Sequence, residues 1–201
     1  MQDAYLRRQK DRFLAPMAGQ MFAAIHPNAV SIIAMFIGLG SVAAVVAQFY
    51  WVGLTLWAIN RIMDGLDGVI ARVHQKQSDF GGFLDLFLDF VIYVTVPIAF
   101  IWAMPTTANL WAGIALLGSY VMNSISWTTL AALLEKRHRQ SSNRLTSMEM
   151  PTGLVEGAET MLFYTLFYFL PGSVAILFAL MAVLVYDTAA QRVWWAYQNL
   201  R

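Results

Sequence analysis

The chain has 201 residues, of which 59% are hydrophobic and only 12% charged, and its formal net charge is +1. A soluble domain of this length carries roughly a quarter charged residues, so the composition excludes an ordinary soluble protein and indicates an integral membrane protein. Cysteine is absent, which excludes a disulfide framework and a thiolate metal site. The three histidines are scattered, so we expect no zinc site, and nucleic acid is not an expected partner.

Residues 1–26 form a segment of their own in the predicted organisation. Basic residues come early in it, and apolar residues follow at helical spacing: Phe13, Leu14, Met17, Met21 and Phe22. This pattern is typical of an interfacial amphipathic helix that lies on the inner leaflet of a membrane. The alternative is a plain basic flank that only sets the topology.

Residues 27–201 contain six apolar segments, each close to the 20 or so residues that cross a bilayer as a helix. We therefore predict an all-α fold, in which one catalytic domain is a polytopic membrane bundle of six transmembrane helices. Pro27 suits the first turn of the first helix, and Asn28 places an amide beside it. The predicted spans lie near residues 29–49, 52–73, 80–104, 109–134, 152–170 and 172–195.

Basic residues gather at one end of the predicted bundle. They precede the first span, flank the connections after the second and fourth spans, and close the chain, whereas the connections after the first, third and fifth spans carry no charge. By the positive-inside rule the basic end faces the cytoplasm. We therefore expect both termini to be cytoplasmic, in what is most simply a bacterial inner membrane.

Four aspartates stand out in the stretch RIMDGLDGVIARVHQKQSDFGGFLDLFLDF, residues 61–90. Asp64 and Asp67 are three apart near the end of the second span, and Asp85 and Asp89 are four apart near the start of the third, so each pair lies on one helix face. A short link joins these spans, so the two faces can converge. A fifth acid, Asp79, is predicted to be the N-cap of the third span.

Four clustered carboxylates repel one another and need protons or cations to neutralise them. Ligands that are all oxygen suit hard cations such as Mg²⁺, Mn²⁺ or Ca²⁺, and four carboxylates can hold two of them. The alternative is a structural cluster in which Arg61 and Arg72 balance the acids without any ligand. Two arginines do not balance four aspartates, and acids within membranes are functional by default, so we favour a metal site.

These residues resemble the signature of the CDP-alcohol phosphatidyltransferase family, D-x2-D-G-x2-A-R-x8-G-x3-D-x3-D. Every fixed position is matched: Asp64, Asp67, Gly68, Ala71, Arg72, Gly81, Asp85 and Asp89. The predicted six-span layout is similar to that family as well. The specific part of the resemblance is confined to residues 64–89.

The resemblance implies a phospholipid-synthesis transferase, which moves a phosphatidyl group from CDP-diacylglycerol to a small polar alcohol and releases CMP. Two ions, Mg²⁺ or Mn²⁺, would be held by Asp64, Asp67, Asp85 and Asp89, and Asp89 would also be the general base. The donor would contact Asn28, Gly68, Ala71, Arg72 and Gly81. A homodimer surrounded by membrane lipids is implied by the family only.

The acceptor site is predicted less specifically. Arg137, Arg139 and Arg144 lie between the fourth and fifth spans and could bind a phosphate on the acceptor, or could merely fix orientation. Glu156 and Glu159 share a helix face and could contact the acceptor or pair with an arginine, Arg144 or Arg61.

Two rival functions stay open at this point. One is an aminoalcohol phosphotransferase that uses a small CDP-alcohol and diacylglycerol. The other, from a different class, is a divalent-cation transporter, because acids in membrane helices also mark ion paths.

Overall fold

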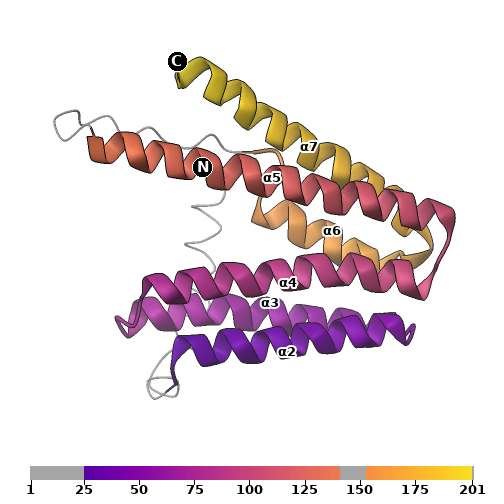
Figure 1. Ribbon diagram of the computed structural model, residues 1–201. Coiled ribbons are helices and arrows are strands. Elements are labelled where there is room, and N and C mark those ends of the chain that lie inside the picture. Colours follow the sequence, from indigo (N-terminus) through magenta and orange to yellow (C-terminus); the bar gives the residue numbers. More distant parts are fainter. Residues whose placement is uncertain (1–24, 141–152, 201) are drawn as a thin grey trace. The chain divides into compact units, whose positions relative to one another are not determined.

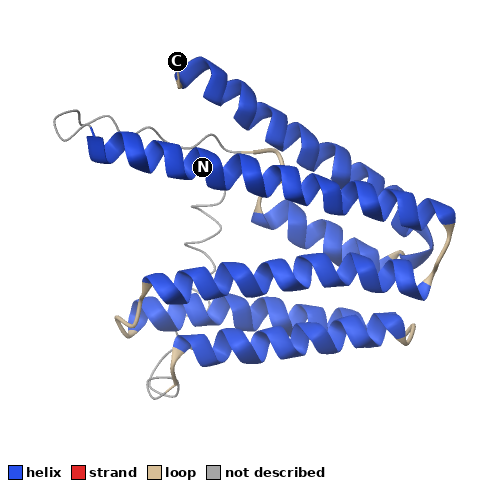
Figure 2. Cartoon of the chain, viewed as in Figure 1, coloured by secondary structure: helices blue, strands red, loops and turns tan. Residues whose placement is uncertain are grey.

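The computed structural model describes residues 25–140 and 153–200, and within these ranges all regular secondary structure is helical (Figure 2). The predicted interfacial helix therefore lies almost entirely outside the described residues. Six α-helices occur in the described ranges, with one 3₁₀ turn, η2 (Pro171–Ser173), before the last of them (Figure 1). They are α2 (Pro27–Val46), α3 (Tyr50–Val73), α4 (Asp79–Ala103), α5 (Thr107–Gln140), α6 (Gly157–Phe169) and α7 (Val174–Asn199).

The starts of α2 and α4 are fixed by side chains that cap the backbone. His26 is the N-cap of α2 and accepts a hydrogen bond from the Asn28 amide, with Pro27 in the first turn as predicted. Ser78, and not Asp79, is the N-cap of α4, where its Oγ accepts from the Gly81 amide at 3.0 Å. The predicted cap was wrong by one residue. Asp79 lies in the first turn, where its charge still favours the helix dipole.

Within residues 25–140 and 153–200, three segments are long and apolar enough to cross a membrane: Pro27–Val46, Asp79–Ala103 and Pro171–Asn199. Helix α3 is long enough but carries several charges, α5 is interrupted by polar residues, and α6 has only 13 residues, or about 20 Å of helix. Large apolar side chains point outward, Trp102 with 74% of its surface exposed, as lipid contact requires. The all-helical membrane fold is confirmed, whereas six complete spans stay a prediction.

The helices form two compact units, each described here by itself. Unit 1 contains α2, α3, α4 and the end of α6, from Tyr164 to Pro171. Within it α2 packs against both α3 and α4, which run alongside it in Figure 1. The approach of α2 to α4 is close at Gly38, where an added Cβ would lie only 2.7 Å from Ile92 Cδ1. This close packing brings polar groups of α2 next to those of α3 and α4.

An aromatic cluster holds the end of α6 in unit 1. The Trp57 ring stacks on Tyr164 and Tyr168, which are both almost fully buried. The Tyr164 hydroxyl donates to the backbone oxygen of Tyr93 at 2.5 Å, and the Tyr168 hydroxyl lies 2.6 Å from Ser41 Oγ. Each buried hydroxyl thus has a partner, and aromatic pairs of this kind contribute about 0.5–1.5 kcal/mol beyond their area. Two members of the cluster, Trp57 and Tyr93, lie against Arg61, which pairs with Asp64 and Asp89.

Unit 2 contains α5, the beginning of α6 and α7. Helix α5 packs along α7, and a buried polar contact joins them, since Arg192 Nη1 donates to Asn123 Oδ1. Thr188 Oγ1 accepts a hydrogen bond from the Val155 amide just before α6. Unit 2 is thus held by polar as well as apolar contacts.

Candidate active site

The four predicted aspartates lie on two helices that are joined by the short link of residues 74–78. Asp64 and Asp67 are in the last turns of α3, and Asp85 and Asp89 are in the first turns of α4. Asp67 is buried, with 4% of its surface exposed, and Ser31 of α2 donates a hydrogen bond to its Oδ2. The side chains of Asp64 and Asp89 are 18% and 22% exposed. Carboxylates so little hydrated need compensating charge.

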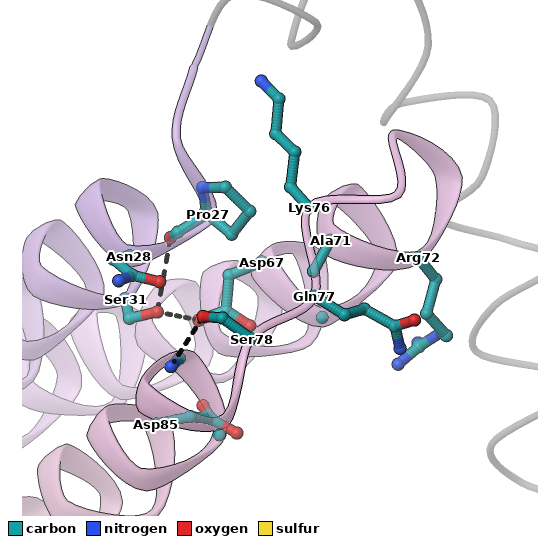
Figure 3. Close-up of a pocket in the computed structure, with 13 residues that line it drawn as sticks. Pro27, Asn28, Ser31, Asp67, Ala71, Arg72, Lys76, Gln77, Ser78 and Asp85 are labelled. Atoms are coloured by element: carbon teal, nitrogen blue, oxygen red, sulfur yellow. Dashed lines mark hydrogen bonds between the residues drawn. The ribbon is translucent and has the colours of Figure 1, made fainter.

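A cavity of about 200 Å³ opens beside Asp67 and Asp85, between the ends of α2, α3 and α4 (Figure 3). The structure brings all five residues that the sequence assigned to the donor into its lining: Asn28, Gly68, Ala71, Arg72 and Gly81. The rest of the lining comes from Pro27, Ser31, Lys76, Gln77, Ser78 and Gly82. A cavity with basic side chains at its rim and carboxylates in its wall suits a phosphate ligand bound through cations.

Two of the lining glycines are closely approached by other side chains. A Cβ at Gly81 would lie 3.2 Å from Asn28 Oδ1, and one at Gly68 would lie 3.3 Å from Arg72 Nη1. Any larger side chain at either position would therefore displace a polar group that lines the cavity. This is a steric reason for glycine at both positions.

A second, smaller pocket adjoins the first. It is lined by Asp64, Asp85 and Asp89, and Asp85 and Ser31 contribute to both pockets. The four carboxylates thus border two adjoining pockets, with Asp67 on the larger cavity, Asp64 and Asp89 on the smaller pocket, and Asp85 on both.

Arg61 is the cation closest to Asp64 and Asp89. Its Nη1 lies 2.8 Å from Asp89 Oδ1 and 3.7 Å from Asp64 Oδ2, and its side chain is 9% exposed. The ion-paired alternative is thus partly realised. Arg61 carries one positive charge against the two carboxylates that it contacts, however, so this pairing by itself does not replace a divalent cation.

The carboxylate oxygens of the four aspartates are suitable ligands for hard divalent cations. No three Asp, Glu or His side chains in the described ranges lie close enough, as placed here, to ligate one ion. The four carboxylates nevertheless border adjoining pockets and offer oxygen ligands only, which are the ligands that Mg²⁺ and Mn²⁺ prefer. Metal binding by these residues stays a prediction.

Sequence reasoning missed two residues that support the site. Ser31, which bonds Asp67, lies one turn after Pro27 and Asn28 on the same face of α2. Asn60 is 1% exposed, and its Nδ2 donates to the Ala34 backbone oxygen at 2.7 Å. Ser31 could have been found from its spacing of three residues after Asn28, which puts both on one helix face. Asn60 could have been found as an amide side chain in an apolar run directly before Arg61.

The predicted acceptor residues belong to unit 2, apart from Arg144, which lies outside the described residues, as does the Arg139 side chain. Arg137 donates to the backbone oxygens of Asn199 and Leu200 at the end of α7. Glu156 accepts from the Gly153 amide, and Glu159 accepts from the Glu156 amide, both at 3.1 Å. These three side chains thus secure helix ends, and an acceptor role for any of the five stays a prediction.

Comparison with known proteins identifies the family. The family model for CDP-alcohol phosphatidyltransferase matches residues 24–195, which is most of the chain and includes every residue of the aspartate cluster. The chain belongs to the CDP-alcohol phosphatidyltransferase family. It is therefore an enzyme of this class, and the cavity and the aspartates lie where the family signature falls.

Individual relatives agree with this assignment. The chain is 33% identical over 178 residues to the inner membrane protein YnjF of Escherichia coli, covering 88% of this chain and 85% of that protein. It is 29% identical over 129 residues to the bifunctional IPC transferase and DIPP synthase of Archaeoglobus fulgidus, covering 62% of this chain but only 25% of that longer protein. The relative named as an inner membrane protein supports an integral membrane location.

The fold is also that of a solved structure. The phosphatidylinositol phosphate synthase PgsA1 of Mycobacterium tuberculosis, solved with CDP-DAG bound, superposes with a TM-score of 0.68 at 20% identity, and the match covers 90% of this chain and 92% of that one. The same protein in complex with manganese and citrate matches with a TM-score of 0.67. At this level of identity the likeness establishes the shared fold.

Proposed function

We propose that this enzyme transfers the phosphatidyl group of CDP-diacylglycerol to a polar alcohol and releases CMP. The observation that carries the proposal is that two adjoining pockets share Ser31 and Asp85. The larger cavity holds every residue assigned to the donor, and Asp85 joins it to the pocket that contains Asp89. The CDP-DAG bound by PgsA1, which shares the fold, supports the choice of donor.

The donor's polar end would occupy the cavity between α2, α3 and α4. Arg72 and Asn28 both line it and carry hydrogen-bond donors, and Gly68 and Gly81 leave room beside these two side chains. The acyl chains would remain in the inner leaflet, because the helices around the cavity expose apolar side chains to lipid. A polar acceptor would arrive from the cytoplasm, the side to which the positive-inside rule assigns these helix ends.

Asp89 would be the general base. Its carboxylate takes the proton of the acceptor hydroxyl as the alcohol oxygen attacks the phosphorus next to the lipid. The new phosphorus–oxygen bond forms while the bond from this phosphorus to the CMP oxygen breaks, and CMP leaves with the electron pair. The proton then passes from Asp89 to water. Asp64, Asp67, Asp85 and Asp89 would hold two divalent ions, Mg²⁺ or Mn²⁺, which supply charge stabilisation for the attacking and leaving oxygens.

The proposed acceptor is an alcohol. The names of related proteins give an order in which candidate alcohols should be tested. A phosphatidylinositol phosphate synthase shares the fold, so inositol phosphate comes first, followed by glycerol 3-phosphate and serine. The five acceptor residues predicted from the sequence, and a homodimeric state, belong to the same proposal.

The proposal is tested with purified protein in detergent, CDP-diacylglycerol, Mg²⁺ or Mn²⁺, and this panel of acceptors. We expect CMP release with at least one acceptor, together with a new phospholipid detected by mass spectrometry. A second arm supplies CDP-choline with diacylglycerol. CMP in that arm alone would reverse donor and acceptor, and no CMP in either arm would overturn the proposal.

Alanine at position 81 should weaken donor binding. The added Cβ would press on Ser78 Oγ at 3.1 Å and on Asn28 Oδ1 at 3.2 Å, and both residues line the cavity. We therefore expect the KM for CDP-diacylglycerol to rise about tenfold, or ~1.4 kcal/mol, with kcat little changed. The matched control is Gly40→Ala, which lies outside the cavity and makes an ordinary 3.5 Å contact with Leu56. An equal KM in the two variants would contradict a donor role for this cavity.

A further inference from the structure

Arg61 is held more completely than any role as a simple counter-charge requires. Its guanidinium lies over two aromatic rings, 4.8 Å from the centroid of Trp57 and 5.4 Å from that of Tyr93. Trp57 is one turn before Arg61 on α3, and Tyr93 is one turn after Asp89 on α4. Two faces in contact with the guanidinium restrict the directions in which its nitrogens can point.

Hydrogen bonds fix the remaining freedom of Arg61. Its Nε donates to Asn60 Oδ1 at 2.8 Å, and Nη1 donates to the Tyr93 hydroxyl at 3.1 Å. Asn60 is itself buried and tied to the Ala34 backbone oxygen of α2 at 2.7 Å. A polar network therefore runs from the backbone of α2 through Asn60 to Arg61 and on to α4.

The end of this network contacts one particular atom of Asp89. Arg61 Nη1 lies 2.8 Å from Asp89 Oδ1, and this oxygen is buried. Since the Asp89 side chain is still 22% exposed, Oδ2 is the oxygen left to face the ligands of the site. The ion pair fixes which carboxylate oxygen is turned inward.

From this geometry we propose that Arg61 is the positioning residue for Asp89. Held by Trp57, Tyr93 and Asn60, it draws Oδ1 inward and thereby presents Oδ2 to the acceptor hydroxyl. Arg61 lies outside the family signature matched at residues 64–89, so the signature does not assign it this role. The inference rests on the proposed function, because it presupposes that Asp89 is the base.

The first test separates positioning from binding. Arg61→Met keeps an unbranched side chain between the two rings but removes the charge and the donors. A misplaced catalytic group commonly costs up to about 100-fold, so we expect kcat for CMP release to fall roughly 10- to 100-fold, with the KM for CDP-diacylglycerol within about twofold. Arg61→Lys should recover part of the loss. Unchanged kcat in Arg61→Met, or a raised KM with kcat unchanged, would overturn the inference.

A double-mutant cycle asks whether Arg61 acts through Asp89. If it does, Arg61→Met should cause no further loss in an Asp89→Asn background, whereas a general structural role would lower activity by the same factor in both backgrounds. Should Asp89→Asn prove fully active, the proposed base itself fails. Should it be inactive while Arg61→Met is fully active, only the role of Arg61 fails.

A structural readout serves if Arg61→Met is too unstable or too inactive for kinetics. In a crystal structure of Arg61→Lys we expect Asp89 to keep Oδ1 directed at the ammonium, and in that of any stable uncharged variant, such as Arg61→Gln, to adopt another rotamer. An unchanged Asp89 rotamer in the uncharged variant would overturn the inference irrespective of activity.

Discussion

Replacement of Asp89 by asparagine should lower kcat for CMP release by about 10²- to 10⁴-fold, the usual contribution of a general base. The amide has the same shape as the carboxylate but cannot take the proton of the acceptor hydroxyl. It also gives up the charge that pairs with Arg61 at 2.8 Å. We therefore expect the fold to persist with a small loss of stability, and the loss of rate to be far larger than any change in KM.

The matched control is Asp187→Asn, the same chemical change at an exposed acid of α7 that accepts a hydrogen bond from Gln191. CMP release and thermal unfolding in detergent are measured for both variants. Full activity in Asp89→Asn would remove Asp89 as the base, and an equal loss in both variants would show that the effect is not specific to the site.

The donor side of the site was predictable because its residues are placed by helix periodicity. Spacings of three and four put Asp64 with Asp67 and Asp85 with Asp89 on single faces, and the packing of both α3 and α4 on α2 brings these faces to the same pockets. The cavity lining then follows from local sequence, as Gly68, Ala71 and Arg72 continue the face of α3 that carries Asp67. The positions of these residues on two consecutive helices could be predicted with little knowledge of the remaining fold.

Contacts across helices were not predictable in the same way. The hydrogen bonds from Ser31 to Asp67 and from Asn60 to the Ala34 oxygen depend on how closely α2 approaches its neighbours. Gly38 allows this close approach, but a glycine in the sequence does not by itself predict it. Arg61 entered the sequence analysis only in alternatives in which it pairs with acids, and its stacking on Trp57 and Tyr93 depends on rotamers set by packing. Pattern reasoning locates polar residues on a face and leaves their partners undetermined.

The ends of the helices were likewise predicted in part. The sixth predicted element was close to α7, whereas the fifth, predicted from residue 152, begins at Gly157 as α6. Glu159 reaches back to the Glu156 amide, a capping arrangement that stops the helix from extending further toward its N-terminus. The spacing of the two acids is the signal for this cap, but the apolar run around it suggested a longer span.

Divalent cations should stabilise this protein, because they relieve the repulsion among four clustered carboxylates, of which Asp64 and Asp89 share the single guanidinium of Arg61. An ion that binds only the folded state adds ~2.7 kcal/mol of stability at a concentration 100 times its dissociation constant. Asp85 should matter most, since it is the aspartate that lines both pockets. EDTA is accordingly expected to abolish CMP release and to lower the unfolding temperature.

Asp85→Asn should weaken Mn²⁺ binding by about tenfold or more, given that loss of a mere outer-shell partner of a metal ligand costs 10- to 100-fold. Binding is measured without turnover, from the electron paramagnetic resonance signal of free Mn²⁺ and from the rise in unfolding temperature with added Mn²⁺. Asp79→Asn is the control, because Asp79 is an exposed acid six residues earlier on the same helix and lines neither pocket. Equal Mn²⁺ affinity in the two variants would show that Asp85 is not a metal ligand. If added Mn²⁺ does not change the unfolding temperature of the unmodified protein, the proposed metal site as a whole is contradicted.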